Sequence, residues 1–319
     1  MRVLITGANG FLGSAILRHA GETGLSLVAT DREAGNAMPG VRFFPADILD
    51  AGALSGVCRN VDCVCHVAGL AHVFKESALS GESFFRVNVT GTENVAHSAG
   101  RAGVRLFVFI SSVSVYGGDT KERDERAPCR PEGPYAESKR RAEETLIEFC
   151  GRNGMDLTIL RLATLFGEGD PGNIARLIRF IDSGKFFWIG SGLNRKSLIH
   201  RDDAGRACVA AIRNPMPGTN IYNVSGPPYT MREIVETIAA RLGRKAPRVR
   251  IPAGLALTVS KAAALLKGER LLRANKTMLK WLSDDVYIAD LFNGTYSFQP
   301  NVGLDEGIRR EVAWYRDGP

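Results

Sequence analysis

Three glycines, Gly7, Gly10 and Gly13, follow the first apolar run of the chain at intervals of three residues. The run is short enough for a strand, and the residues after Gly10 have the apolar spacing of a helix. A strand, a tight turn and a helix in this order need glycine at the turn, where the backbone approaches a phosphate, and where the helix packs on the strand. The free N–H groups and positive dipole end of the helix would face a pyrophosphate. We therefore predict a dinucleotide site that includes Gly7, Asn9, Gly10, Phe11, Leu12 and Gly13.

An acidic residue, Asp31, ends the second apolar run, about 20 positions after this turn. A carboxylate there can accept hydrogen bonds from the ribose hydroxyls of the adenosine and would repel a 2′-phosphate. The sequence therefore favours NAD over NADP, while Arg32 beside the carboxylate leaves NADP open.

Apolar runs alternate with stretches of helical period through the first half of the chain. This alternation is typical of an α/β, Rossmann-type doubly wound parallel sheet. The runs are Arg2–Thr6, Leu25–Thr30, Val41–Pro45, Val61–Val67, Arg105–Ser111 and Leu157–Arg161.

Beyond about residue 168 the alternation fades, and helices punctuated by glycine and proline follow. We expect an NAD-binding domain with the catalytic residues at 1–167 and a smaller, mixed, mainly substrate-binding part at 168–319. The strand Asn220–Val224 could return to the large sheet. The apolar stretch Ala253–Leu266 is expected to be a packed helix rather than a membrane contact.

The net charge of +7 suits an anionic ligand such as a nucleotide sugar. The basic residues are scattered, without the run interleaved with aromatic residues that a nucleic-acid surface would show, so no nucleic-acid partner is expected. The six cysteines have no paired C-x-x-C spacing, so we expect reduced core thiols and neither a metal site nor disulfides. There is no signal segment and no run of about 18 apolar residues, so a cytoplasmic protein without a membrane span is expected.

Two more strand ends carry residues suited to a cofactor. Asp47 and Ile48 follow the third run, where the carboxyl end of a strand would meet the adenine, although Asp47 could equally cap the next helix. Small residues after the fourth run would let the backbone approach the cofactor, and they are Val67, Ala68 and Gly69.

Two polar residues near these strands are expected to support the fold. His66, just before Val67, is predicted to be a strand-end packing residue rather than a catalyst. Asn88 lies in a predicted amphipathic helix that runs to about Gly103, and its side chain is expected to tie the helix to a strand.

Hydroxyl side chains cluster after the fifth run, at Ser111, Ser112 and Ser114, where ligands bind in folds of this kind. Downstream, Tyr135 and Lys139 are four residues apart and share one helical face. A lysine cation beside a phenol favours the phenolate, so Tyr135 could act as a general base near neutral pH.

These motifs resemble the extended short-chain dehydrogenase/reductase family, in its nucleotide-sugar epimerase and reductase branch. The family's TGxxGxxG turn corresponds to Thr6 to Gly13, its catalytic Ser or Thr to Ser112, and its YxxxK pair to Tyr135 and Lys139. The resemblance implies bound NAD, a UDP-linked sugar substrate and a homodimer through the helices near residues 85–100 and 136–150. Residues that it further assigns to cofactor contact are Asp47, Ile48, Val67, Ala68, Gly69, Asn88 and Ser111, and those assigned to substrate contact are Ser112, Ser114, Tyr135, Thr164, Asn173, Arg195 and Lys196.

The chain departs from the family pattern at two places. The family's 4,6-dehydratases have Asp-Glu directly after the catalytic Thr, whereas this chain has Val113 and Ser114, which argues against dehydration. Many members have Asn in an R-x-x-N-x-x-G pattern that begins here at Arg161, whereas this chain has Thr164.

Three functions follow from this resemblance. The first is a 4-epimerase of a UDP-hexose or UDP-N-acetylhexosamine that acts through a transient 4-keto intermediate. The second is an NAD(P)H-dependent 4-ketoreductase of a UDP-4-keto-6-deoxy sugar, which would use the same residues. The third is a non-catalytic NAD-binding subunit, which would be expected to have lost Ser112, Tyr135 or Lys139, although all three are present.

Overall fold

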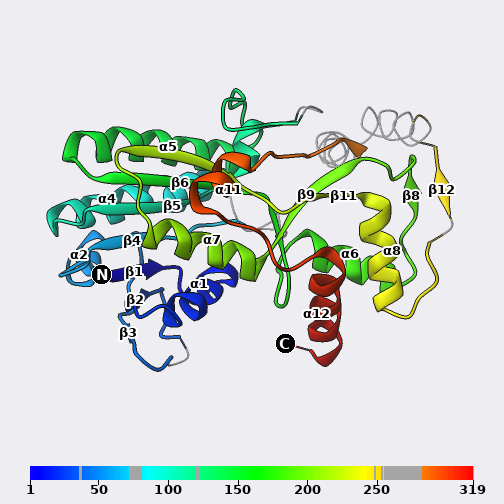
Figure 1. Cartoon of the computed structure of the whole chain (residues 1–319), viewed down its shortest axis with the longest axis horizontal. Helices are drawn as coiled ribbons and strands as arrows, with labels where there is room; N and C mark the ends of the chain where they lie inside the picture. Colours follow the sequence, from blue (N-terminus) through cyan, green and yellow to red (C-terminus); the bar gives the residue numbers. More distant parts are fainter. Residues whose placement is uncertain are drawn as a thin grey trace.

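The computed structural model describes residues 1–35, 38–71, 81–118, 122–247, 249–252, 254 and 282–318. Within these residues, parallel strands form one large sheet in the order β10-β6-β5-β4-β1-β2-β3 (Figure 1). The strands are β1 (Arg2–Thr6), β2 (Ser26–Thr30), β3 (Val41–Phe43), β4 (Cys63–His66), β5 (Leu106–Ser112), β6 (Asp156–Leu162) and β10 (Thr219–Val224).

This arrangement confirms the predicted Rossmann-type doubly wound sheet. Each of the six apolar runs coincides with one strand to within two residues at either end, and Val3, Leu4 and Ile5 on β1 have no exposed surface. Both faces of the sheet are apolar because helices cover both. The strand order reverses between β1 and β4, so ligands are expected in the crevice outside the carboxyl ends of these strands.

Helices pack on both faces of the large sheet. One hydrophobic cluster joins α1 (Phe11–Gly21), α7 (Arg201–Arg213) and α11 (Asp290–Tyr296) to one face. A second cluster joins α2 (Ala51–Val57), α4 (Gly91–Arg101) and α5 (Pro134–Asn153) to the other face. A short helix, α3 (Gly81–Phe85), precedes the residues that lead into α4.

The second half of the chain returns to the large sheet. β10 pairs in parallel with β6, and α7 packs beside α1. The strand near residues 220–224 therefore belongs to the large sheet, whereas the division of the chain at residue 167 stays a prediction.

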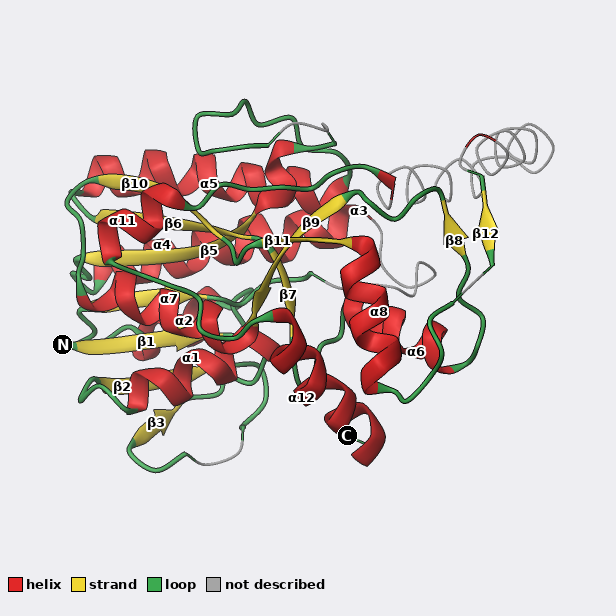
Figure 2. Ribbon diagram, turned by 45° about the vertical axis from the view of Figure 1, so that its right-hand side comes forward, coloured by secondary structure: helices red, strands yellow, loops and turns green. Residues whose placement is uncertain are grey.

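A smaller lobe lies beside the carboxyl ends of the large sheet (Figure 2). It contains a three-stranded sheet of β11 (Pro228–Thr230), β9 (Arg195–His200) and β7 (Thr164–Phe166), and a pair formed by β8 (Trp188–Ile189) and β12 (Arg250–Ile251). A third hydrophobic cluster packs α6 (Asn173–Asp182), α8 (Met231–Arg241) and α12 (Leu304–Asp317) together. The predicted helix Ala253–Leu266 lies, apart from Gly254, outside the described residues.

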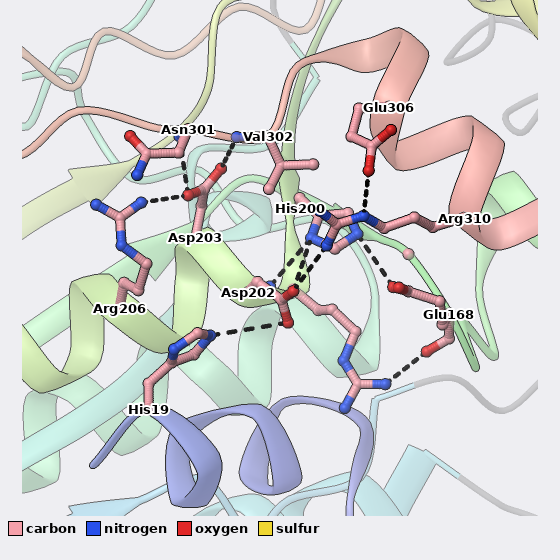
Figure 3. Close-up of polar contacts among 12 residues, drawn as sticks. His19, Glu168, His200, Asp202, Asp203, Arg206, Asn301, Val302, Glu306 and Arg310 are labelled. Carbon is pink, nitrogen blue, oxygen red and sulfur yellow. Dashed lines mark hydrogen bonds and ion pairs between the residues drawn. The ribbon is translucent and has the colours of Figure 1, made fainter. Parts of the chain in front are cut away.

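Polar contacts hold α12 against the start of α7 (Figure 3). Arg310 donates to Asp202 over 3.2 Å and to Glu306 over 2.6 Å. His200 caps α7 by accepting from the backbone N–H of Asp202, and its Nε2 lies 3.2 Å from Oε2 of Glu168. These contacts bring the end of the chain to the loop that follows β7.

The helix predicted through Asn88 is not a regular α-helix. Residues Arg86–Thr90 form a π-helical turn, η1, and α4 then ends at Arg101. The hydroxyl of Thr92 donates to the carbonyl of Asn88 over 2.7 Å and competes with the backbone hydrogen bonds there. Such turns often lie at functional sites.

Candidate active site

The glycine turn after β1 has the geometry that a dinucleotide needs. Gly7 has a φ of 67°, which favours glycine, and a Cβ there would come within 2.7 Å of the backbone of Ala68. A Cβ at Gly13 would collide with the carbonyl oxygen of Gly7, so only glycine lets α1 lie this close to the turn. Gly10 is exposed at the N-terminus of α1. The side chain of Leu12 is buried in the core, so Leu12 could contact a cofactor only through its backbone.

Asp31 lies at the end of β2, beside the glycine turn. Its carboxylate accepts hydrogen bonds from the backbone N–H groups of Asn9 over 3.0 Å and of Arg32 over 2.8 Å. A carboxylate at this strand end can accept hydrogen bonds from the adenosine ribose of NAD, and the Arg32 side chain is exposed. These residues fit NAD.

Asp47 and Ile48 follow β3, but only one of them has an exposed side chain. Asp47 is exposed and lines a surface hollow of about 470 Å³, whereas Ile48 packs against Gly91 in the core. The alternative that Asp47 caps the next helix is wrong, because Asp50 caps α2 by accepting from the N–H groups of residues 52 and 53.

The small residues after β4 run past α5. A Cβ at Gly69 would lie 3.0 Å from Oδ1 of Asn88 and 3.4 Å from Nζ of Lys139. Asn88 accepts from the backbone N–H of Leu70 and donates to its carbonyl and to the hydroxyl of Ser138. Asn88 was predicted to tie its helix to a strand, but it instead ties η1 to the loop after β4 and to α5.

Ser112 ends β5, and its Oγ accepts from the N–H of Ser114 over 3.1 Å. It also lies close enough to Tyr135, in the first turn of α5, to lower the pKa of that phenol. Burial raises the pKa of Tyr135, and the nearby Ser112 side chain opposes this. The phenolate at neutral pH, expected from the neighbouring lysine, is therefore not favoured in the protein without ligands.

Lys139 is buried one turn after Tyr135. Its Nζ donates to the carbonyl of Ile110 over 2.8 Å and lies 4.9 Å from the centre of the Phe109 ring. Burial lowers the pKa of Lys139 to about 8, and the charge of Glu143 opposes this.

Ser111 was predicted to contact the cofactor, and the structure corrects this. Its hydroxyl is buried and donates to Oε1 of Glu143 over 2.6 Å. Successive residues of a strand point to opposite faces, so Ser111 and Ser112 cannot both face the site. Ser111 instead belongs to a buried network in which Arg161 pairs with Glu143 and donates to the hydroxyl of Tyr116.

Four of the predicted substrate residues lie on the smaller lobe. Thr164 on β7 and Asn173 at the start of α6 are exposed. On β9, Arg195 forms ion pairs with Glu122 and Asp284, and Nζ of Lys196 lies 2.9 Å from Oδ2 of Asp285. The structure thus places these residues on three separate elements, and acidic partners compensate the two basic ones.

The residues that support α5, Glu143 and Tyr116, are not predicted from the sequence. Glu143 follows Lys139 by four residues on the same helical face, a spacing that could have identified it. Tyr116 donates to Asn223 on β10 over 2.8 Å, and no local pattern connects two residues so far apart in sequence.

Three comparisons describe what the chain resembles. A family model described as the NAD dependent epimerase/dehydratase family matches residues 3–225. An N-acetyl-alpha-D-glucosaminyl-diphospho-ditrans,octacis-undecaprenol 4-epimerase of Escherichia coli O157:H7 is 31% identical over 253 residues, which cover 78% of this chain and 75% of that relative. A UDP-glucose 4-epimerase of Vibrio cholerae is 29% identical over 260 residues, which cover 78% of each chain. The solved structure of MoeE5 in complex with UDP-glucuronic acid and NAD has a TM-score of 0.80 and 26% identity, with 99% of both chains covered.

Proposed function

The chain belongs to the NAD dependent epimerase/dehydratase family, and we propose that within it the protein is an NAD-dependent 4-epimerase of a UDP-linked hexose or N-acetylhexosamine. As a member of this family it is an enzyme with NAD as its cofactor. Relatives named 4-epimerases and a similar structure that holds UDP-glucuronic acid with NAD support the reaction and the substrate class.

The observation that carries the proposal is that Ser112 and Tyr135 lie close together, with Lys139 one helical turn after Tyr135 and beside Gly69. Tyr135 takes the proton from the sugar 4-hydroxyl, and Ser112 donates a hydrogen bond to the same oxygen. Lys139 holds the nicotinamide ribose and supplies positive charge near the phenol. NAD bound there would supply the hydride acceptor and donor that such a reaction needs.

The residues after Ser112 argue against dehydration, although the family includes dehydratases. Val113 is buried in the core, and Ser114 has no ionisable group, so neither can serve as the acid or base for eliminating water. The 4-ketoreductase remains the competing reaction, because it would use Ser112 and Tyr135 in the same way.

One incubation separates the two reactions. The purified protein is mixed with UDP-GlcNAc, UDP-GalNAc, UDP-glucose or UDP-galactose without added reductant, and the products are separated by chromatography. Interconversion of UDP-GlcNAc with UDP-GalNAc, or of UDP-glucose with UDP-galactose, is the expected result. If all four sugars return unchanged while a UDP-4-keto-6-deoxy sugar oxidises added NADH or NADPH stoichiometrically, the reductase replaces the epimerase.

The homodimer stays part of this proposal. The resemblance favours contact through α4 and α5, which pack on each other and share an aromatic contact between His97 and Phe149. Light scattering after size exclusion should give twice the 34.6 kDa mass of one chain. A monomer at micromolar concentration would contradict it.

A further inference from the structure

His66, at the end of β4, has no exposed surface and uses both of its ring nitrogens. Its Nδ1 lies 2.7 Å from the hydroxyl of Thr6 on β1. Its Nε2 lies 2.9 Å from the hydroxyl of Thr92 on α4. The imidazole therefore joins β1, which precedes the glycine turn, to α4.

The neighbouring hydrogen bonds leave one arrangement of protons. Thr92 donates its hydroxyl hydrogen to the carbonyl of Asn88, so it accepts from Nε2–H of His66. Thr6 accepts from the N–H groups of Val67 and Ala68, each over 3.2 Å, and donates its own hydrogen to Nδ1. Burial and the positive charge of Lys139 lower the pKa of His66 to about 3, so the ring is neutral at physiological pH. Every donor in this hydrogen-bond network finds an acceptor only when His66 carries its hydrogen on Nε2.

One arm of this hydrogen-bond network, through Thr6, positions the backbone that faces the cofactor. Thr6 holds both N–H groups of the Val67–Ala68 segment. The same segment approaches Gly7 so closely that a Cβ would lie 2.7 Å from Ala68. Rotation of the Thr6 hydroxyl would therefore shift Val67 and Ala68, which we call the wall of the NAD site.

The other arm reaches the catalytic helix. Asn88, whose carbonyl accepts from Thr92, donates through its side chain to the hydroxyl of Ser138 over 2.9 Å. Ser138 donates in turn to the carbonyl of Tyr135 over 2.8 Å, within the first turn of α5. This arm sets where the first turn of α5 lies relative to the strand ends.

We propose that neutral His66 is a positioning residue, which sets the distance between the wall of the NAD site and Tyr135 by donating to Thr92 and accepting from Thr6. This proposal rests on the proposed function for the identity of the reaction. Its first part, the effect of His66 on NAD binding through Thr6, can be tested without a sugar. His66 touches no reacting atom, so its effect is on geometry. A misplacement of about 1 Å near the reacting groups can lower a rate by roughly 10²-fold.

Two substitutions separate the arms. In His66→Gln the amide nitrogen can take the place of Nε2 and keep the donor to Thr92, but the acceptor for Thr6 is lost. In His66→Asn the amide oxygen can take the place of Nδ1 and keep the acceptor for Thr6, but the donor to Thr92 is lost. We expect His66→Gln to bind NAD about tenfold more weakly with kcat within about threefold of wild type, consistent with loss of one buried hydrogen bond. We expect His66→Asn to bind NAD almost normally, with kcat lowered by roughly 10²-fold and KM for the sugar nearly unchanged.

The measurements are NAD affinity by fluorescence titration, and kcat and KM on whichever sugar substrate the wild type converts, with the folded fraction followed by circular dichroism. Thr92→Val keeps His66 and removes the same arm as His66→Asn, so it should lower kcat alike, and Thr92→Ser should restore it. The double variant His66→Asn/Thr92→Val should lose no more than either single variant.

A purely structural role would change both arms together. If kcat and NAD affinity fall by the same factor in both His66 variants, or stay within about twofold of wild type in folded protein, the proposal is overturned. If neither His66 variant folds, Thr92→Val with normal kcat overturns it as well. Absence of epimerase activity in the wild type would contradict the proposed function alone, since the NAD affinities would still differ between the two His66 variants.

Discussion

Glu143 on α5 and Arg161 on β6 form a buried, two-pronged ion pair. Nε of Arg161 donates to Oε1 over 3.0 Å, and Nη2 donates to Oε2 over 2.7 Å. Glu143 has no exposed surface, and Arg161 is 2% exposed. Because Ser111 also donates to Glu143, the pair anchors α5 to the ends of β5 and β6.

Removal of one partner should destabilise the protein strongly. Arg161→Met removes the two-pronged partner of the buried Glu143 carboxylate and leaves the cation of Arg140, whose Nη1 donates to Oε2 over 3.2 Å, so we expect the free energy of unfolding to fall by about 3 kcal/mol. Urea unfolding measures this. Arg152, which pairs with Glu148 on the exposed face of the same helix, is the matched control, and Arg152→Met should change the stability by less than about 1 kcal/mol. Equal effects of the two substitutions would contradict the structural importance of the buried pair.

Tyr135→Phe should abolish turnover and leave NAD binding nearly intact. The substitution keeps the ring and removes the oxygen proposed to transfer the proton, a contribution of typically 10²–10⁴-fold in rate. The rate is measured on the sugar panel and the affinity by fluorescence titration. Tyr315→Phe, which removes a hydroxyl on α12 bonded to Asp182, is the control and should keep full activity. A Tyr135→Phe rate above about a tenth of wild type would show that Tyr135 is not the base.

The pH dependence of kcat/KM should report Lys139. Its pKa in the free protein is lowered to about 8 by burial, so the ammonium is lost as the pH rises through that value. We expect kcat/KM to fall above about pH 8, when Lys139 becomes neutral. Lys139→Arg keeps a positive charge to much higher pH, so its profile should lose this descending limb even if its maximal rate is lower. An identical limb in both proteins would assign it to another group.

Asp31 should give NAD its preference over NADP. Its carboxylate, held by the N–H groups of Asn9 and Arg32, would repel a 2′-phosphate. We expect wild-type protein to bind NAD at least about tenfold more tightly than NADP, a difference of about 1.4 kcal/mol. Asp31→Asn keeps the shape and removes the charge, so it should bind NADP more tightly and leave NAD affinity within a few-fold. Tighter binding of NADP by the wild type would overturn the role of Asp31.

Glu311 should make stability fall as the pH rises. It is buried on α12, accepts from the N–H of Gly167 over 3.0 Å, and has a pKa raised to about 9 by burial and then by the charge of Asp170. The folded state therefore binds a proton that the unfolded state releases above its ordinary pKa of 4.5. The stabilisation is complete below pH 4.5 and is lost as the pH rises towards 9, at up to about 1.4 kcal/mol per pH unit.

Glu311→Gln cannot ionise, so its thermal midpoint should exceed that of the wild type at pH 8 by at least about 2 °C. The two proteins should differ less at pH 5. The exposed Glu148→Gln is the control and should follow the wild type at both pH values. A Glu311→Gln midpoint that falls with pH as steeply as that of the wild type would show that another group causes the dependence.

Local sequence patterns predicted most of the large sheet and the centre of the site. The apolar runs gave six strands within a few residues of their observed bounds, because a buried parallel strand needs a continuous apolar run. The spacing of Tyr135 and Lys139 placed them on one face of a helix, which α5 confirms. Ser111 was assigned wrongly because the run of hydroxyls does not reveal which residue of the strand faces the site.

By itself, the sequence determined the glycine turn, the carboxylate at Asp31, the strands and the helical register of Tyr135 and Lys139. Each of these depends on residues within a few positions of one another and on the geometry of one element. Only the tertiary structure decided that Arg161 lies against Glu143 and that β10 completes the sheet. It also decided that His66 joins Thr6 to Thr92. These contacts arise where elements far apart in the chain pack together, and buried polar groups must then find partners that no local periodicity encodes.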